Sequence, residues 1–209
     1  YEVFVGPVSA YSTVGWFNDP LLNTVLKRPD PELAGVLFHE LAHQQLFLSG
    51  DTAFSESFAT AVEIEGVRRW LADQGKPEEF SIYMERLKRR EQFMELVLRY
   101  RKKLETLYTS TKSDDDKRIE KARTFEELRR DYAAFKTGWG GYSGFDAWLT
   151  GGELNNARMG AVGVYHQYVP AFQALLVKVG GDFERFYREA EKLTKLPAPE
   201  RTKKLTNFE

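Results

Sequence analysis

Hydrophobic residues recur every three or four positions through most of this chain, which is the spacing of one face of an α-helix. Pro31, which suits the first turn of a helix, follows Asp30, a residue type that commonly caps helix N-termini. Gly50 and Gly75 each follow such a run and are expected to end it. The pattern and its end signals predict helices over residues 31–48, 52–74, 77–110, 113–137, 155–168, 170–179 and 182–193.

Three segments lack this spacing. Residues 1–8 are β-branched and aromatic up to Gly6 and Pro7, which predicts a short N-terminal strand. Within residues 3–14 such a strand either pairs with an extended peptide at its edge or is purely structural. Residues 138–152 are rich in glycine and aromatics, and predict a long loop that either closes over a ligand or simply connects helices. The end of the chain, from Pro197, has the character of a loose tail.

His39 and His43 lie four positions apart on the first long predicted helix, with Glu40 beside His39. Residues four apart share one helix face, so both imidazoles can reach one metal ion. Zinc lowers the pKa of a bound water towards about 7, and a neighbouring glutamate can then take its proton. The motif therefore predicts a catalytic zinc ion with Glu40 as general base. The alternative is that two of the three histidines of the chain fall on a buried helix by chance.

A catalytic zinc ion usually has three protein ligands and one open position. The chain has no cysteine, so the third ligand must be a histidine or a carboxylate. The candidates downstream are Asp51, Glu56, Glu63, Glu65 and His166. If the first two helices form an antiparallel hairpin turning at residues 49–50, Glu56 lies level with His43 and Glu63 about two turns further along. This spacing favours Glu56, and leaves Glu63 either to support a ligand or to line the substrate cleft.

The composition of the chain argues against nucleic-acid binding and against a transmembrane segment. Hydrophobic residues make up 42% and charged residues 29% of the chain, which is typical of a globular protein, and the net charge is −1. So small a charge offers no field for nucleic acid, and the basic residues of 88–103 alternate with glutamates as on a solvated helix face. No run of 18 apolar residues is present, so no transmembrane segment is expected.

The sequence resembles two groups of zinc peptidases. HELAH (39–43) and SESFA (55–59) resemble the gluzincins, whose third ligand lies in an NEGFA-type segment. Here Glu56 follows His43 by only 13 positions, and Thr60 stands where some gluzincins have an aspartate that orients a histidine. A closer resemblance is to the bacterial family of predicted aminopeptidases with an HExxH motif. It is carried by AYSTVGWFNDPLL (10–22), LAGVLFHELAHQ (33–44), GDTAFSESFATAVEIEGVRRWL (50–71) and NNARMGAVGVYHQYVPAFQALL (155–176).

The resemblance implies a zincin-like fold that uses one zinc ion to hydrolyse a peptide substrate. It also implies a bacterial protein that is periplasmic or a membrane-anchored lipoprotein. Because the chain has no cysteine to carry a lipid, any such anchor is expected outside this sequence, which begins with Tyr1. The expected fold class is mainly α (α+β): a single zincin-like catalytic domain over residues 1–209, with a small N-terminal strand element and a long helical hairpin inserted over residues 77–137.

Several residues are candidates for supporting roles. Tyr165 or His166, on a segment that the resemblance covers, is expected to stabilise the oxyanion, unless each is an ordinary core residue. Asn155, Asn156 and Arg158 are candidates for binding the substrate, although an asparagine here equally suits a helix N-cap. An aminopeptidase also needs an acidic group for the free amine of its substrate, and Glu63 and Glu153 are candidates. The alternatives to an aminopeptidase are a zinc endopeptidase and a helical binding module with a structural zinc ion.

Overall fold

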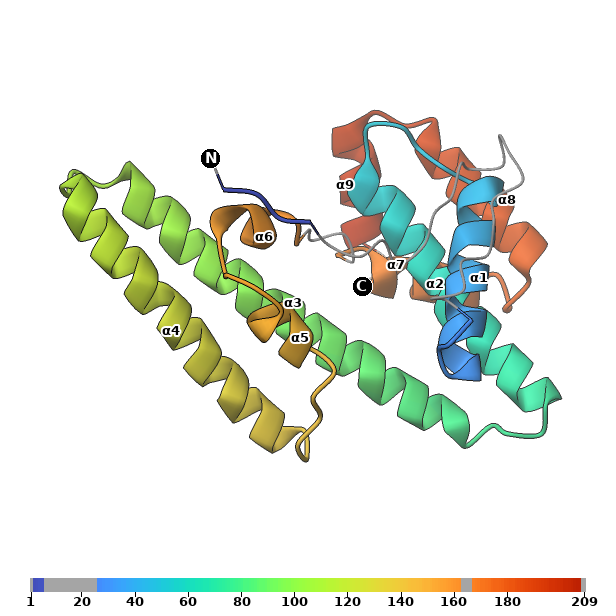
Figure 1. The fold of residues 1–209 in the computed structure, drawn as a ribbon. Helices are drawn as coiled ribbons and strands as arrows, with labels where there is room; N and C mark the ends of the chain where they lie inside the picture. The colour runs from blue at the N-terminus through green and yellow to red at the C-terminus, as the bar shows by residue number, and fades with distance from the viewer. Residues whose placement is uncertain (1, 6–25, 163–166, 208–209) are drawn as a thin grey trace. The chain divides into compact units, whose positions relative to one another are not determined.

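The computed structural model describes residues 2–5, 26–162 and 167–207, and the regular secondary structure within those ranges is all helical (Figure 1). Nine helices and no strand occur in this part of the chain. They are α1 (Asp30–Gln45), α2 (Thr52–Asp73), α3 (Glu79–Thr109), α4 (Asp114–Gly138), α5 (Asp146–Thr150), α6 (Asn156–Gly160), α7 (Val169–Lys178), α8 (Phe183–Thr194) and α9 (Ala198–Thr206). The mixed α+β class expected from the sequence is therefore corrected to all-helical for the residues described.

The expected N-terminal strand is wrong for residues 2–5, which have no regular structure. Side chains hold this segment instead of a strand ladder. Asn155 donates its Nδ2–H to the carbonyl of Val3 at 3.0 Å, and the backbone N–H of Asn156 donates to the Glu2 carboxylate at 2.7 Å. Residues 6–8, and most of the edge expected over 3–14, lie outside the described residues.

The chain divides into two compact units. The α1–α2 unit comprises Pro7–Tyr83 and Tyr165–Glu209, and the hairpin unit comprises Tyr1–Gly6 and Met84–Val164. Helix α3 belongs to both, because its first residues lie in the α1–α2 unit and the rest in the hairpin unit. That the whole chain forms a single domain with an inserted hairpin stays a prediction.

Helix α2 is the centre of the α1–α2 unit, and packs against α1 and α7. Phe54 and Phe58, one turn apart on α2, are fully buried against Phe172 of α7 and Phe186 of α8. The rings of Phe58 and Phe186 are stacked with centroids 5.5 Å apart, and Phe172 meets Phe54 edge-on at 5.1 Å. This aromatic core holds one face of α2, which leaves the opposite face for α1.

Helix α1 is shorter than its hydrophobic pattern predicts. It ends at Gln45, and Leu46 is extended, with φ −152° and ψ 119°. Leu46 and Leu48 pack against the core from this extended segment. The hydroxyl of Ser55, on the first turn of α2, accepts the backbone N–H of Leu48 at 3.0 Å, so the connection between the helices is bonded back onto α2.

The expectation of a loose C-terminal tail is also wrong. Pro199 lies in the first turn of α9, where a missing N–H costs nothing. The Arg201 guanidinium donates two hydrogen bonds to Asp51 Oδ2, at 2.7 and 3.1 Å, and Leu205 is buried. Helix α9 is thereby attached to the N-terminus of α2, which Asp51 caps through the backbone N–H of Phe54.

In the hairpin unit, α3 and α4 pack along each other. Their shared hydrophobic cluster includes Phe93 and Val97 of α3 and Leu128 of α4, and Tyr100 donates its hydroxyl to Asp131 at 2.7 Å. The segment 138–152, expected to be a long loop, contains α5, and Phe145 stacks on Phe93 with centroids 4.3 Å apart. This segment is therefore packed against the hairpin and is not an open connection.

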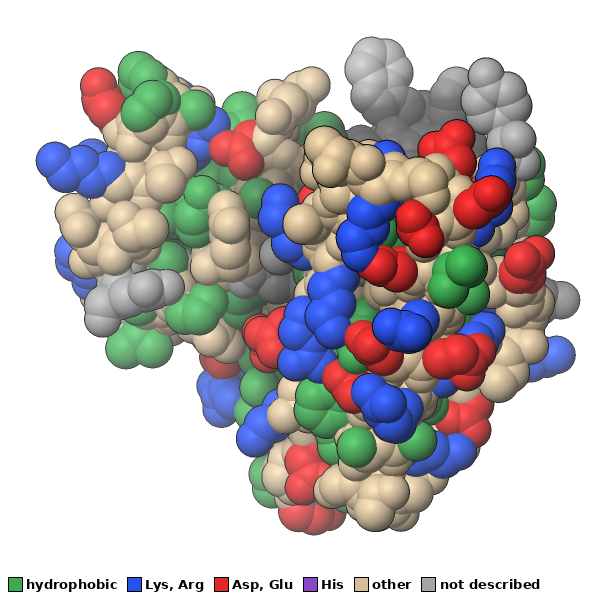
Figure 2. Space-filling model, turned by 90° about the vertical axis from the view of Figure 1, so that its left-hand side faces the viewer, with side chains coloured by type: hydrophobic (Ala, Val, Ile, Leu, Met, Phe, Trp, Pro, Cys, Tyr) green, Lys and Arg blue, Asp and Glu red, His purple; other side chains and the backbone are tan. Residues whose placement is uncertain are grey.

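Charged side chains of both signs are interspersed over the face shown in Figure 2. On α3, Arg89 pairs with Glu85 at 3.0 Å and Arg101 with Glu105 at 3.2 Å. The basic residues of this helix thus have acidic neighbours one turn away, as the sequence pattern indicated. Among the described residues, no helix is both long enough and apolar enough to cross a membrane.

Candidate metal centre

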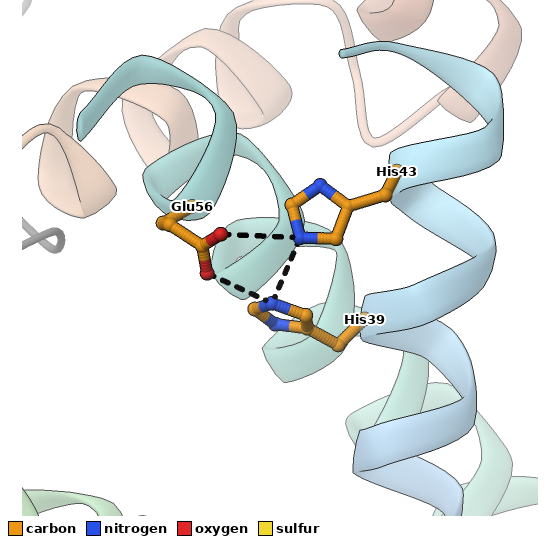
Figure 3. Close-up of side chains that lie close together, drawn as sticks. All are labelled: His39, His43 and Glu56. Carbon is orange, nitrogen blue, oxygen red and sulfur yellow. Dashed lines mark hydrogen bonds and ion pairs between the residues drawn. The ribbon is translucent and has the colours of Figure 1, made fainter. Parts of the chain in front are cut away.

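Helices α1 and α2 run antiparallel, and their facing sides carry the histidines and the carboxylates. His39 and His43 project from α1 towards Glu56 on α2 (Figure 3). One and two turns beyond Glu56 on α2 lie Thr60 and Glu63, since residues four and seven apart share a helix face. The antiparallel hairpin expected from the sequence therefore brings His39, His43 and Glu56 together.

A glycine on α2 allows the two helices to approach closely. A Cβ atom at Gly66 would lie 2.8 Å from the ring of Phe38, a separation that real Cβ atoms almost never show. Phe38 precedes His39 directly on α1. Glycine at position 66 thus leaves room for a ring next to the first histidine of the site.

Side-chain atoms of three residues converge between the helices. The Nε2 atoms of His39 and His43 lie 3.2 Å apart, and the two Glu56 oxygens lie 3.2 Å from His39 Nε2 and 3.5 Å from His43 Nε2. These residues are the one group of three or more metal-binding side chains in the described part of the chain whose ligand atoms all lie within 4.8 Å of one another. Sequence spacing and structure therefore agree on the same three residues.

The spacing of these atoms fits a zinc ion. Nitrogen and oxygen ligands lie about 2.1 Å from zinc, so two ligands of a tetrahedral site are separated by roughly 3.4 Å. The observed separations of 3.2–3.5 Å match that value. Two imidazole nitrogens and one carboxylate are also a donor set that catalytic zinc sites use, with a fourth position left for water or substrate.

The far side of His39 is held by a second carboxylate. Its Nδ1–H donates to Glu63 Oε2 at 2.9 Å, which directs the lone pair of Nε2 towards Glu56 and His43. Glu63 in turn accepts the hydroxyl of Tyr83 at its other oxygen, 2.6 Å away. With both oxygens engaged within the chain, Glu63 has the contacts of a residue that supports a ligand, which is one of the two roles its spacing allowed.

The electrostatics of the site favour a positive charge. Burial acts to lower the pKa of His39, but the hydrogen bonds that Glu56 and Glu63 accept from it, together with their negative charges, outweigh burial and raise the pKa to about 9. The pKa of His43 is lowered, first by burial and then by the charge on His39, against the opposing pull of Glu56 and Glu40. The two carboxylates thus create a field that stabilises a cation among these side chains.

Comparison with families of known proteins matched residues 1–205 to the family described as "Putative aminopeptidase". The chain belongs to this family. No curated protein and no solved structure matched it. The resemblance drawn from four sequence segments is therefore confirmed at the level of the family, and the match extends over nearly the whole chain.

Glu40 is the residue of the HExxH motif that the sequence predicts as general base. It follows His39 on α1, is half-buried, and lies close enough for its charge to act on His43. A carboxylate beside the ligands, but not among them, is the arrangement that a general base needs. That Glu40 acts as the general base stays a prediction of the motif.

The other site residues expected from the sequence are not among the contacts of this cluster that the structure describes. Tyr165 and His166 fall outside the described residues. Asn155 is the N-cap of α6, accepting the backbone N–H of Arg158, and the Asn156 side chain accepts the hydroxyl of Tyr108. Asn155, Asn156 and Arg158 belong to the hairpin unit, and their roles in substrate binding stay predictions.

Arg158, a candidate for binding the substrate, makes hydrogen bonds to the backbone within the hairpin unit. Its guanidinium is 7% exposed and donates to the carbonyls of Trp148, Gly151 and Gly152 at 3.0–3.3 Å. These carbonyls lie at the C-terminal end of α5, where backbone acceptors lack helical partners. The contacts are those of an arginine that caps a short helix.

Sequence reasoning missed two residues of the site, Tyr83 and Gly35. Tyr83 lies within the third predicted helix, residues 77–110, and a sequence cannot show where its hydroxyl points. Gly35 is buried in the middle of α1, where glycine is unfavourable by about 1 kcal/mol relative to alanine. A glycine at such a position is the kind of signal that indicates close approach by another group.

Proposed function

We propose that this protein is a zinc-dependent aminopeptidase whose zinc ion is held by His39, His43 and Glu56. The observation that carries the proposal is the convergence of these three side chains at zinc-like separations, with Glu40 beside them. Membership of the aminopeptidase family supports peptide as the substrate. The zincin-like character of the core is part of this proposal, because the HExxH helix and the helix bearing the third ligand are its defining elements.

The reaction is the addition of water across a peptide bond. Zinc bound at this site supplies Lewis-acid polarisation of the substrate carbonyl and of the attacking water. Glu40 accepts a proton from that water as the new C–O bond forms, and passes it to the amine nitrogen as the C–N bond breaks. Glu63 holds His39 in the tautomer and orientation that leave Nε2 available.

Stabilisation of the oxyanion is assigned to Tyr165 or His166. The support is the family resemblance of their segment, together with the need of such a reaction for a hydrogen-bond donor facing the developing charge. Loss of one such donor lowers kcat by about 100-fold to 1000-fold. Tyr165→Phe and His166→Gln variants, compared for kcat at unchanged zinc content, will identify which of the two acts.

The proposal is tested by the Glu40→Gln variant on peptides with free and acetylated N-termini. We expect the wild-type protein to release the first residue of the free peptide only, and the variant to lose this activity while keeping one zinc ion per chain. Cleavage of the acetylated peptide would instead show an endopeptidase. Unchanged hydrolysis in the variant, or zinc binding with no hydrolysis of any peptide by the wild type, would contradict the catalytic role.

We further propose that the protein is bacterial, and is either periplasmic or itself a membrane-anchored lipoprotein. The support is the resemblance to a family in which lipoproteins are common. Separation of periplasmic, membrane and cytoplasmic fractions from cells expressing the natural gene will test it. Recovery of the protein in the cytoplasm alone would contradict the proposal.

A further inference from the structure

A tyrosine is connected to the metal centre through two successive hydrogen bonds, which lead to the ring of His39. The hydroxyl of Tyr83, near the start of α3, donates to Glu63 Oε1 at 2.6 Å, and Glu63 Oε2 accepts Nδ1–H of His39 at 2.9 Å. Tyr83 is 4% exposed, and the Glu63 side chain is 12% exposed. The relay from Tyr83 through Glu63 to His39 is therefore shielded from water, where hydrogen bonds are stronger and more directional.

We propose that Tyr83 is a positioning residue for the metal centre, acting through Glu63 on His39, and that Gly35 is required to admit its hydroxyl. This inference rests on the proposed zinc site. Without the tyrosine, one oxygen of a largely buried carboxylate loses this donor, and Glu63 can then rotate away from His39. Groups that hold a metal-ligating histidine from behind commonly contribute 10-fold to 100-fold to metal affinity.

Gly35 makes room for this contact. A Cβ atom at position 35 would lie 2.7 Å from the Tyr83 hydroxyl and 3.3 Å from Glu63 Oε1. The next ring atom of Tyr83, Cζ, would lie 3.4 Å away, which is ordinary contact. An alanine at position 35 therefore conflicts mainly with the hydroxyl, and more weakly with Glu63 Oε1, but not with the ring. Glycine in the middle of α1 is explained by this conflict, although alanine would favour the helix.

The test measures zinc affinity directly, by competition with a chromophoric chelator, in the full chain. We expect Tyr83→Phe to weaken zinc binding by on the order of 10-fold, and to change the visible absorption of the cobalt-substituted protein. Tyr100→Phe is the matched control, because it removes a similar buried hydroxyl from Asp131 within the hairpin unit. It should leave both readouts unchanged.

Gly35→Ala separates positioning from general stability. The substitution improves helix propensity, so a purely structural account expects zinc affinity to be unchanged. The relay predicts that affinity falls to the level of Tyr83→Phe. In the Tyr83→Phe background the same alanine should have a much smaller further effect on affinity, because the severe conflict with the hydroxyl is gone and only the 3.3 Å contact with Glu63 Oε1 is left.

The outcomes distinguish this inference from the proposed function. If wild type binds zinc but Tyr83→Phe and Gly35→Ala bind it equally well, the relay is wrong and the zinc peptidase stands. Equal losses of affinity in Tyr83→Phe and Tyr100→Phe would also overturn the relay, since general destabilisation would then explain both. If the wild-type protein binds no zinc, the proposed function and the inference both fall.

Discussion

Glu56 is the residue on which the ligand set depends most, because it is the one ligand that the HExxH motif does not contain. The sequence favours Glu56 because it lies level with His43 in an antiparallel hairpin. In the structure its two oxygens lie 3.2 Å from Nε2 of His39 and 3.5 Å from Nε2 of His43. Sequence reasoning could find this residue because the connection between α1 and α2 is short, and a short connection fixes register. It could not find Tyr83, whose contact with Glu63 depends on how a third helix is placed.

Replacing Glu56 by glutamine should remove most zinc binding. The amide keeps the size of the side chain but has no negative charge, so we expect zinc affinity to fall by more than about 100-fold, beyond the effect of a supporting residue. Glu65→Gln is the matched control on the same helix, because Glu65 pairs with Arg68 and Arg69 away from the ligands. Equal affinity in Glu56→Gln and wild type, measured by equilibrium dialysis, would remove Glu56 from the site.

Among the elements, the α1–α2 pair carries the site, and its helical content was predictable from hydrophobic spacing alone. The end of α1 was not, because Leu46 and Leu48 fit a helical stripe as well as they fit the extended segment that buries them. The helix α9 was missed because a run with two prolines and many charges has little hydrophobic signal. Its position depends on Arg201 and Asp51, which are 150 residues apart in sequence.

Gly66→Ala tests the close approach of these two helices. The new Cβ would lie 2.8 Å from the Phe38 ring, so we expect a loss of about 1–3 kcal/mol in the free energy of unfolding, despite the better helix propensity of alanine. Gly138→Ala, at the end of α4, is the control, because nothing lies within 4 Å of its new Cβ. Urea titration measures both. A Gly66→Ala protein as stable as wild type would show that the helices can separate without cost.

For the molecule as a whole, the Asp51–Arg201 pair joins the C-terminal helix to the start of α2. Arg201 is 7% exposed, and its second role is to donate to the carbonyl of Leu196. Asp51→Asn keeps a side-chain oxygen that can cap α2 but removes the charge, whereas Asp51→Ala removes both. We expect Asp51→Ala to be less stable than Asp51→Asn by about 1 kcal/mol, the usual contribution of an N-cap. Thermal unfolding of the two variants, compared with wild type, checks the order.

The two compact units make a separate prediction about metal removal. A zinc ion bound at the proposed site would bind only the folded α1–α2 unit, so at 100 times its Kd we expect it to stabilise that unit by about 2.7 kcal/mol. Hydrogen exchange with and without a chelator should show slower exchange in α1 and α2 when zinc is bound, and unchanged exchange in α4, which lies in the hairpin unit. Equal slowing in both units would show that they unfold together.

Anomalous scattering at the zinc absorption edge will show whether one zinc ion lies between α1 and α2. We expect a single strong peak about 2.0–2.2 Å from Nε2 of His39, Nε2 of His43 and a carboxylate oxygen of Glu56. A crystal grown with zinc that shows no peak there, or a peak held by other side chains, would contradict it.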